Sequence, residues 1–527
     1  MLSLCTKRML FLAIFTSLTI SCGKSKSTPT LTPMPTVAPV AVLAEAENFK
    51  FIDCPFQIPE GMPQNVVLAI QCANLTVPED RKQPDGSQIK LAVAIVKTTS
   101  TTPKPDPLLV LFGNPGYGLD LTLNLPYIFE NIYTQRDLII IDQRGTGYSQ
   151  PSFSCPEFDD LSHESVIQNF GEQEGNNRYV EATRTCANRV KASTSNLAAY
   201  TTASVAADLE DLRLALGVSQ WNIFTLFDGS TLALTMMRDY PQAVRSVIMD
   251  SVVPLQADPI AELGTNVELA FDRLFERCLE DEDCNKTYPK LKTTFYALLD
   301  QLNAQAITID VADLNSGERY KVMLDSDQLT YFIMVLLSSS IDRESLPEIP
   351  RMIYQLKEGK TEVIARLMGS HPLFNTGYSA IGRWMDCNEE YHFSTLEKVT
   401  KANTNVDPRL QKYIYSQAEG IFRACEEWGV PGVPETENQA VTSSIPTLLL
   451  AGEFDWNTPP AWADWIAQTL SNSTALEFPG TGQIVYLSGT SSLCAHEVVN
   501  AFLETPAARP DTSCASKPID LLWVTLP

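Results

Sequence analysis

The stretch WNIFTLFDGSTLALTMMRDYP, residues 221–241, decides the fold. An apolar run leads into a tight turn at Asp228-Gly229, and a helical pattern follows at once. Strand, sharp turn and helix is an arrangement that exposes a nucleophile at the end of a strand. The residue at the tip of this turn is Phe227, which has no hydroxyl, thiol or carboxylate. The stretch therefore predicts the frame of a catalytic turn without its reactive group.

The same alternation extends on both sides of this stretch. Apolar runs that end in glycine-rich loops are typical of buried strands, and helical spacing lies between them; the segments are PLLVLFGNPGYG, RDLIIIDQRGTGYS, DLEDLRLALGV and VRSVIMDSVVP. Before them, residues 49–100 have a β pattern with a turn-rich centre, which predicts a hairpin. Alternating strands and helices predict an α/β fold with a mostly parallel sheet, covered by helices on both faces.

The pattern changes in the middle of the chain. From about residue 255 to residue 444 the spacing is mainly helical, and strand–loop segments return at IPTLLLAGEFDWNTPP. We therefore expect a core made of residues 48–254 and 445–527, with an inserted helical cap at residues 255–444.

The first residues have the features of an export signal. Lys7 and Arg8 precede the apolar run MLFLAIFTSLTI, which is too short for a membrane-spanning helix. LTISC resembles a bacterial lipobox, which implies cleavage after residue 21 and lipid on Cys22. Residues 22–47 then form a Pro/Thr-rich linker, which is expected to stay extended. The predicted location is extracytoplasmic, with a lipid anchor in a bacterial membrane.

Twelve cysteines support an oxidising compartment. Cys5 leaves with the signal and Cys22 would carry lipid, so an even number, ten, remains. These ten fall into local couples, although the sequence alone does not fix their pairing: Cys54/Cys72, Cys155/Cys186, Cys278/Cys284, Cys387/Cys425 and Cys494/Cys514. No spacing suggests zinc, and no metal is expected.

The formal net charge of −24 argues against nucleic acid as a partner, because phosphate backbones require clustered Lys and Arg. It leaves a cationic or neutral ligand open. The glycine-rich GNPGYG does not fit the dinucleotide pattern G-x-G-x-x-G, so no cofactor is expected.

Several segments together resemble the tripeptidyl-aminopeptidase-like branch of the α/β-hydrolases, which is related to proline iminopeptidases. They occur in the family's order: GNPGYG, RDLIIIDQRGTGYSQP, LALTMMRDYPQAVRSVIMDSVVP, RCLEDEDC and IPTLLLAGEFDWNTPP. The resemblance runs from Phe49 to the end of the chain and implies an α/β-hydrolase fold that cleaves acyl bonds with Ser, Asp and His. A gapless match to G-x-S-x-G places Thr225 and Gly229 at the glycines and Phe227 at the serine.

The resemblance also implies positions for the acid and the base. GEFDWNTP matches the family's GxxDxxTP and gives Asp455 as the acid, with Trp456 where proline is common. The alternative for Asp455 is a turn-capping role. In PGTGQIV, Gln483 stands at the histidine position, and an amide does not titrate near neutral pH.

Further site residues follow from the same resemblance. The oxyanion hole would use the N–H of Asp228 and a donor from Asn114, although the Asp228 carboxylate disfavours a second negative charge nearby. Glu389 or Glu390 would bind the free α-amine of a ligand, as cap carboxylates do in related exopeptidases. A solvated acidic pair is the alternative for these two residues.

Two further expectations concern the turn itself. The β-branched Thr225 is expected to crowd it, and Ser230 is expected to help cap the following helix. The four histidines are His163, His371, His392 and His496, none of which lies in the loop after the last strand.

Three hypotheses remain open. The first is a lipid-anchored pseudohydrolase that binds a peptide or small molecule between core and cap, or a protein on its surface. The second is an active hydrolase with a non-standard nucleophile such as Asp228, which requires a one-residue shift of the match. The third is a scaffold without a ligand.

Overall fold

The computed structural model describes residues 47–113, 118–168, 170–194, 196–314, 316–338, 345–370, 379–517 and 519–525. The expected signal segment, Cys22 and nearly all of the predicted linker lie outside these residues. Within the described ranges, no helix has the length and apolar character needed to cross a membrane.

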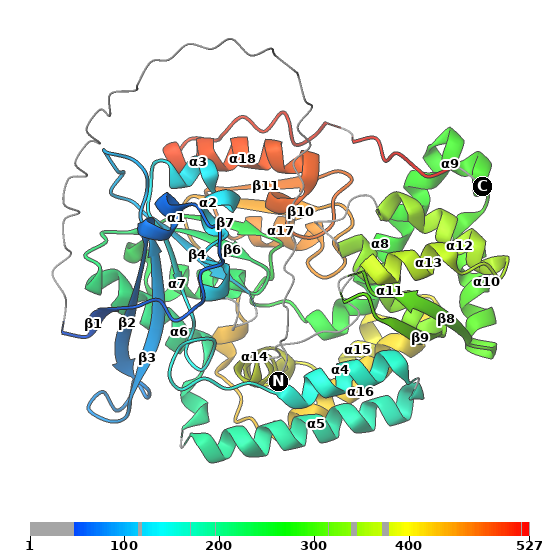
Figure 1. Ribbon diagram of the computed structural model, residues 1–527, viewed down its shortest axis with the longest axis horizontal. Helices are drawn as coiled ribbons and strands as arrows, with labels where there is room; N and C mark the ends of the chain where they lie inside the picture. The colour runs from blue at the N-terminus through cyan, green and yellow to red at the C-terminus, as the bar shows by residue number, and fades with distance from the viewer. Residues whose placement is uncertain are drawn as a thin grey trace, which may run out of the picture. The chain divides into compact units, whose positions relative to one another are not determined.

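One nine-stranded sheet lies at the centre of the fold (Figure 1). Its strands, in spatial order, are β1 (Phe49–Ile52), β2 (Ile70–Pro78), β3 (Gln88–Val96), β5 (Leu138–Ile141), β4 (Leu108–Phe112), β6 (Trp221–Leu226), β7 (Val244–Asp250), β10 (Thr447–Gly452) and β11 (Ser473–Phe478). The pairs from β1 to β5 are antiparallel, and those from β5 to β11 are parallel. The predicted hairpin is the β2–β3 pair.

Helices cover both faces of the sheet, because the central strands are apolar on both sides. On β6, Trp221 and Ile223 pack into one apolar cluster, and Phe224 and Leu226 pack into the other. The first cluster includes residues of α6 (Thr202–Ala215), α7 (Gly229–Asp239) and α17 (Pro460–Ala467). The second includes residues of α2 (Leu125–Ile128), α3 (Glu130–Tyr133) and α18 (Gly489–Glu504). The predicted α/β fold class is confirmed.

Between β7 and β10 the chain is mainly helical and has an apolar cluster of its own. We call this part the cap, and its helices are α8 (Pro259–Glu280), α9 (Glu282–Thr287), α10 (Leu291–Ala304), α11 (Ser326–Ser338), α12 (Ile349–Lys357), α13 (Glu362–Ser370), α14 (Ala380–Met385), α15 (Leu396–Ala402) and α16 (Pro408–Trp428). A short π-helix, Asp386–Glu390, follows α14.

Two features differ from the sequence expectation. The cap contains a hairpin, β8 (Ile307–Ala312) and β9 (Arg319–Leu324), whose short half-exposed strands carry little signal among helices. The chain between β5 and α6 also forms α4 (Pro156–Ile167) and α5 (Gly171–Ser193), and α5 packs along α16 (Figure 1). The cap's helices are therefore joined by a segment from the first half of the core.

All ten described cysteines form disulfides, in the five expected local pairs: Cys54–Cys72, Cys155–Cys186, Cys278–Cys284, Cys387–Cys425 and Cys494–Cys514. Each bridge joins segments that are near one another in the sequence, so the bridges stiffen local structure more than they join distant parts. The expected disulfide framework is confirmed.

Cys72 is the one of these cysteines that lies within a strand of the central sheet. It was expected only as a disulfide candidate, and it is 2% exposed on β2 and belongs to an apolar cluster of the core. Its partner Cys54 packs against the same cluster. Because Cys72 is both buried and bonded, its role is structural, and it does not belong to the functional site.

Candidate functional site

The turn after β6 keeps the backbone of a nucleophile elbow. Phe227 has φ 51°, in the left-handed region that a bulky side chain rarely adopts. Its N–H donates to the Asp250 carbonyl at 3.1 Å, which ties the turn to the end of β7. A Cβ at Gly229 would lie 2.7 Å from the Leu111 carbonyl, so this position requires glycine. The half-buried phenyl ring of Phe227 thus occupies the tip of a strained turn.

Thr225 is buried beside Gly229, and a Cβ at Gly229 would lie 3.3 Å from the Thr225 Cβ, so the turn is closely packed here and forms because Gly229 has no side chain. One expectation about this turn is wrong. Ser230 does not cap the helix; its hydroxyl donates to the Phe227 carbonyl at 2.6 Å and accepts from Val253 N–H at 2.8 Å. Ser230 therefore fixes the turn against the segment that follows β7.

Asp455 lies buried in the loop after β10, and residues of that loop donate several hydrogen bonds to its carboxylate. Its Oδ1 accepts from the backbone N–H groups of Asn457 and Thr458 at 3.0 and 2.9 Å, and its Oδ2 accepts from the Thr458 hydroxyl. A further hydrogen bond joins it to Ser251. Burial raises the pKa of Asp455 to about 6 despite these bonds. The turn-capping role that was the alternative for Asp455 is present in the structure.

Gln483 lies in the loop after β11. Its N–H donates to the Ser338 carbonyl at 3.2 Å, and its side-chain Nε2 is buried with no hydrogen-bond partner among the described residues. The next residue, Ile484, has φ 56° and donates its N–H to the Ser251 hydroxyl at 2.9 Å. The side chain of Gln483 is an amide, which can donate and accept hydrogen bonds but does not titrate near neutral pH.

The end of β7 connects the three loops. Asp250 accepts from the N–H groups of Val485 and Tyr486 at 3.0 and 2.8 Å, and its carbonyl holds the Phe227 N–H. Ser251 bonds both Asp455 and Ile484. Burial, opposed by the two backbone bonds, raises the pKa of Asp250 to about 7. The loops that carry positions 227, 455 and 483 thus meet around this strand end.

Two acidic residues of the π-helix lie near enough to the elbow for their charges to interact with it. The charges of Asp386 and Glu390 both interact with that of Asp228. Asp228 is exposed at the turn, yet the surrounding protein displaces enough water to raise the pKa of its carboxyl. Burial likewise raises the pKa of Asp386 to about 7 and that of Glu390 well above its usual range, with the neighbouring carboxylates adding to the shift of Glu390. We call Asp228, Asp386 and Glu390 the acidic triplet.

Glu389 has a different position from Glu390. Its carboxylate accepts from the backbone N–H and hydroxyl of Thr202, at 2.9 and 2.5 Å, at the start of α6. Glu389 therefore connects the cap to the core, and of the two expected amine-binding residues only Glu390 belongs to the acidic triplet.

The comparisons with known proteins agree with this architecture. The family model described as "TAP-like protein" matches residues 411–514. Serine protease Hip1 of Mycobacterium tuberculosis is 25% identical over 455 residues, covering 82% of this chain and 84% of the relative. The putative hydrolase YuaR of Escherichia coli is 23% identical over 467 residues, covering 84% and 87%. Tripeptidyl aminopeptidase of Streptomyces lividans is 30% identical over 222 residues, covering 40% of each chain. The chain is a peptidase-like α/β-hydrolase.

The second expected oxyanion donor of this peptidase-like hydrolase, Asn114, lies outside the described residues. Its neighbour Gly113 is described, and a Cβ there would lie 2.7 Å from the Asp228 nitrogen. The chain just before Asn114 therefore passes close to the first expected donor.

The histidines do not supply a base among the side chains that the structure describes. His496 donates from Nε2 to the Tyr486 carbonyl, at 2.9 Å, and packs on the Tyr486 ring. His392 lies in the cap over Gly432. His371 and the side chain of His163 lie outside the described part of the peptidase-like hydrolase.

The hydroxyls near Asp455 are not free nucleophiles either. Those of Ser251 and Thr458 are buried, and both are used in internal hydrogen bonds. Neither hydroxyl therefore replaces the one that position 227 lacks.

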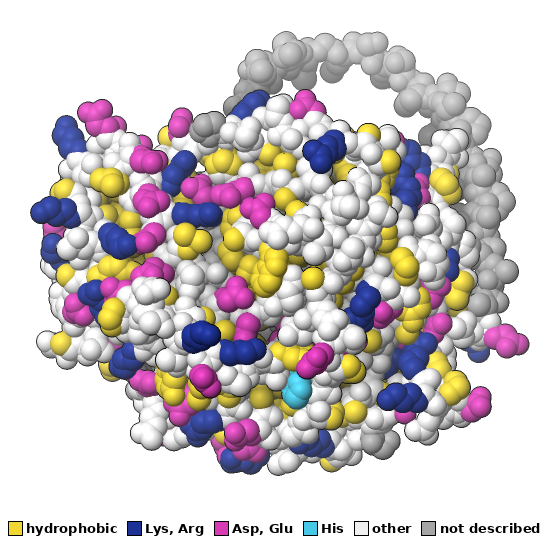
Figure 2. All heavy atoms as spheres, turned by 180° about the vertical axis from the view of Figure 1, so that it is seen from behind, with side chains coloured by type: hydrophobic (Ala, Val, Ile, Leu, Met, Phe, Trp, Pro, Cys, Tyr) yellow, Lys and Arg dark blue, Asp and Glu magenta, His cyan; other side chains and the backbone are white. Residues whose placement is uncertain are grey.

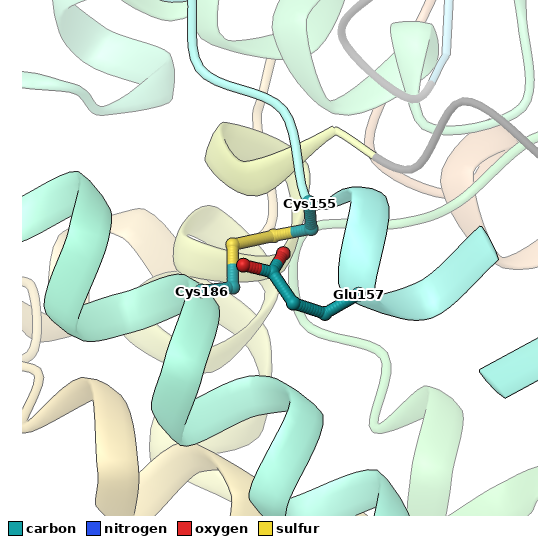
Figure 3. Close-up of side chains that lie close together, drawn as sticks. All are labelled: Cys155, Glu157 and Cys186. Carbon is teal, nitrogen blue, oxygen red and sulfur yellow. A yellow bond between two sulfur atoms is a disulfide. The ribbon is translucent and has the colours of Figure 1, made fainter. Parts of the chain in front are cut away.

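One cluster has the residue types of a metal site. Cys155, Glu157 and Cys186 lie together, but the two sulfurs are bonded to each other (Figure 3). Glu157 is paired with Arg189. With its thiols in a disulfide, this cluster lacks the thiolates that a metal would need.

Sequence reasoning missed Asp386 and Ser251. Asp386 could have been found, since it lies one helical turn before Glu389 and Glu390 and helical neighbours share a face. Ser251 gave no signal, because its role depends on contacts with two loops that are about 200 residues away.

Proposed function

We propose that this peptidase-like hydrolase is a non-catalytic, lipid-anchored binding protein of the extracytoplasmic space. The observation that carries the proposal is Phe227 at the tip of an otherwise preserved elbow. A phenyl ring has no electron pair for attack on an acyl carbon, and Gln483 offers no titrating group to remove a proton. Loss of the nucleophile alone costs roughly a million-fold in a comparable hydrolase.

The ligand that the acidic triplet fits best is a cation, such as the free amine of a peptide. The charges of Asp386 and Glu390, in the cap, interact with that of Asp228, in the core, and Arg383 is the cation that lowers the pKa of Asp386. An ammonium group would relieve the repulsion between these carboxylates and donate charge-assisted hydrogen bonds to them.

A turnover assay tests the non-catalytic part. Purified protein is incubated with chromogenic tripeptide and acetyl ester substrates, beside Asp228→Asn and Phe227→Ala variants. We expect no turnover above the buffer rate in any of the three. Turnover that disappears in Asp228→Asn but persists in Phe227→Ala would replace the proposal by the alternative, an active hydrolase with Asp228 as nucleophile.

Calorimetry tests the ligand. Trialanine with a free amine should bind the protein, and its N-acetylated form should bind at least about tenfold more weakly, a difference of about 1.4 kcal/mol. Glu390→Gln should remove the preference, while Glu426→Gln, an exposed residue of α16, should keep it. Equal binding of both peptides, or none, would contradict an amine site.

Metabolic labelling with a fatty acid tests the anchor. The proposal expects label on the full chain and none on Cys22→Ser. A labelled Cys22→Ser variant, or an unlabelled parent protein, would exclude lipidation at Cys22.

A further inference from the structure

The cap and the core meet along a charged seam. Arg273 of α8 donates to the Glu453 carbonyl at 2.6 Å and pairs with Glu477 at 3.4 Å. Arg277, one turn later, pairs with Glu453 at 3.8 Å. Glu453 in turn accepts from the N–H of Gly480, in the loop that carries Gln483, at 2.6 Å. The seam thus joins α8 to the loops that hold the acid and base positions.

The last described segment, residues 519–525, crosses this seam. It leaves the region of α18 and ends beside α9 (Figure 1). The Ile519 carbonyl accepts from Arg277 at 2.7 Å, and a Cβ at Gly480 would lie 3.3 Å from the Ile519 Cβ. One residue of this segment therefore contacts both sides of the seam.

The remainder of the segment is held by the cap. Leu521 is 9% exposed and belongs to the cap's apolar cluster, against which Trp523 also packs. Val524 donates its N–H to the Pro347 carbonyl at 3.3 Å and accepts from the Tyr288 hydroxyl. Phe454 and Trp456, which flank Asp455, pack on the same apolar cluster.

The disulfides do not duplicate the contact that residues 519–525 make between the cap and the core. The Cys494–Cys514 disulfide ties the chain before the segment to α18 of the core. None of the five described disulfides joins the cap to the sheet strands or to the helices that cover them. The segment therefore has a covalently fixed base on the core and a non-covalent end in the cap.

We propose that residues 519–525 act as a strap that holds the cap against the core along this seam. The strap restrains α8 and the loop after β11 because it contacts Arg277 and lies against Gly480. The loop after β10 is restrained with them through Glu453, which is bonded to both of these residues. Release of the strap frees the cap to move away from those loops while the sheet stays folded. This inference concerns motion of the cap and holds whether or not the site binds an amine.

Hydrogen exchange on the whole protein tests the strap. A chain that ends before Ile519 should exchange at least about tenfold faster than the full chain in α8 and in residues 480–484. The strands β6 and β7 should exchange at unchanged rates. Unchanged exchange along the seam, or an equal increase in the sheet, would overturn the proposal.

A point variant decides the matter if the shortened chain fails to fold. Leu521→Ser removes the apolar end of the strap and should give the same local increase in exchange. Leu522→Ser is the matched control, because Leu522 is 82% exposed and should leave exchange unaltered. Equal exchange in the two variants would overturn the proposal.

Discussion

At the scale of single residues, the elbow has the backbone that a nucleophile needs but not its side chain. Phe227 keeps the left-handed backbone, and Gly229 keeps the open approach to β4. Only the side chain differs from what the chemistry requires. The same holds at position 483, where the loop after β11 carries an amide instead of an imidazole.

We therefore expect Phe227→Ser combined with Gln483→His to restore weak esterase activity, at least about tenfold above the parent, because the turn is already shaped for a nucleophile. Hydrolysis of p-nitrophenyl acetate measures it. Phe227→Ala with Gln483→His is the control, since it has a base and no nucleophile. A folded double variant no faster than this control would mean that the loops no longer align.

Protonation of Asp386 should make the stability of the protein depend on pH. Its folded pKa is raised to about 7 by burial, from 3.8. The unfolded chain thus releases this proton first, so the contribution of Asp386 to the free energy of unfolding declines as pH rises from about 4 to about 7. Urea unfolding should show that Asp386→Asn loses less stability than the parent over this range.

Glu427 provides a control, because its pKa is shifted in the opposite direction from that of Asp386. The hydrogen bond from Arg184 lowers its pKa, so its contribution is present above its usual pKa and is lost as pH falls. Between about pH 4 and pH 7, the free energy of unfolding of Glu427→Gln should therefore change nearly as much as that of the parent. A matching response in both variants would contradict the assigned cause.

Positions 227, 455 and 483 were predicted from the resemblance of three short motifs to those of the α/β-hydrolases, and each motif follows an apolar run that reads as a strand. The sequence did not predict Ser251, whose hydroxyl bridges two distant loops. It also did not separate Glu389 from Glu390, since that difference depends on which side chain meets Thr202. Long-range packing, not local pattern, decides these roles.

At the scale of elements, the π-helix Asp386–Glu390 holds two of the three residues in the acidic triplet. The Cys387–Cys425 disulfide fixes it to α16, and Glu389 fixes it to α6. Carboxylates that repel one another are thus held in place by a covalent bond and a helix cap.

Replacement of both Cys387 and Cys425 by Ser should lower the free energy of unfolding by about 4 kcal/mol, since the closed loop spans 38 residues. It should also weaken trialanine binding, if the site binds amines, because the π-helix loses its fixed position. Calorimetry and urea unfolding measure the two effects.

The Cys278–Cys284 pair is the matched control. Its separation of 6 residues predicts a smaller loss, about 2 kcal/mol, and no change in binding. Equal effects on binding from the two replacements would show that the π-helix holds its position without its disulfide.

Some elements of the fold were predicted from the sequence and others were not. The parallel strands were predicted because they are continuous apolar runs. The β8–β9 hairpin was missed although β8 alternates exposed and buried residues, because both strands are short and lie among helical segments. The pairing of α5 with α16 was also missed, because it joins segments about 240 residues apart and has no local signature.

At the scale of the whole molecule, the chain carries 63 acidic and 39 basic side chains. One face shows both signs interspersed between apolar patches, with no gathered basic area (Figure 2). Excess negative charge attracts cations over a distance that salt shortens.

Association of a cationic peptide should therefore slow as sodium chloride rises from about 0.05 M to about 0.5 M, by roughly several-fold. Surface plasmon resonance measures the association rate with trilysine. An uncharged acetylated peptide of equal length should respond little, and an equal salt response would point to an effect that is not electrostatic.

The disulfides have a consequence for how this molecule matures. None of the five described bridges spans more than 38 residues, so each of these ten cysteines finds its partner within a short stretch of newly exposed chain. A polypeptide that emerges N-terminus first can close each bridge in turn, from Cys54–Cys72 onward, before the next couple appears. Oxidation of this chain thus demands little reshuffling by an isomerase.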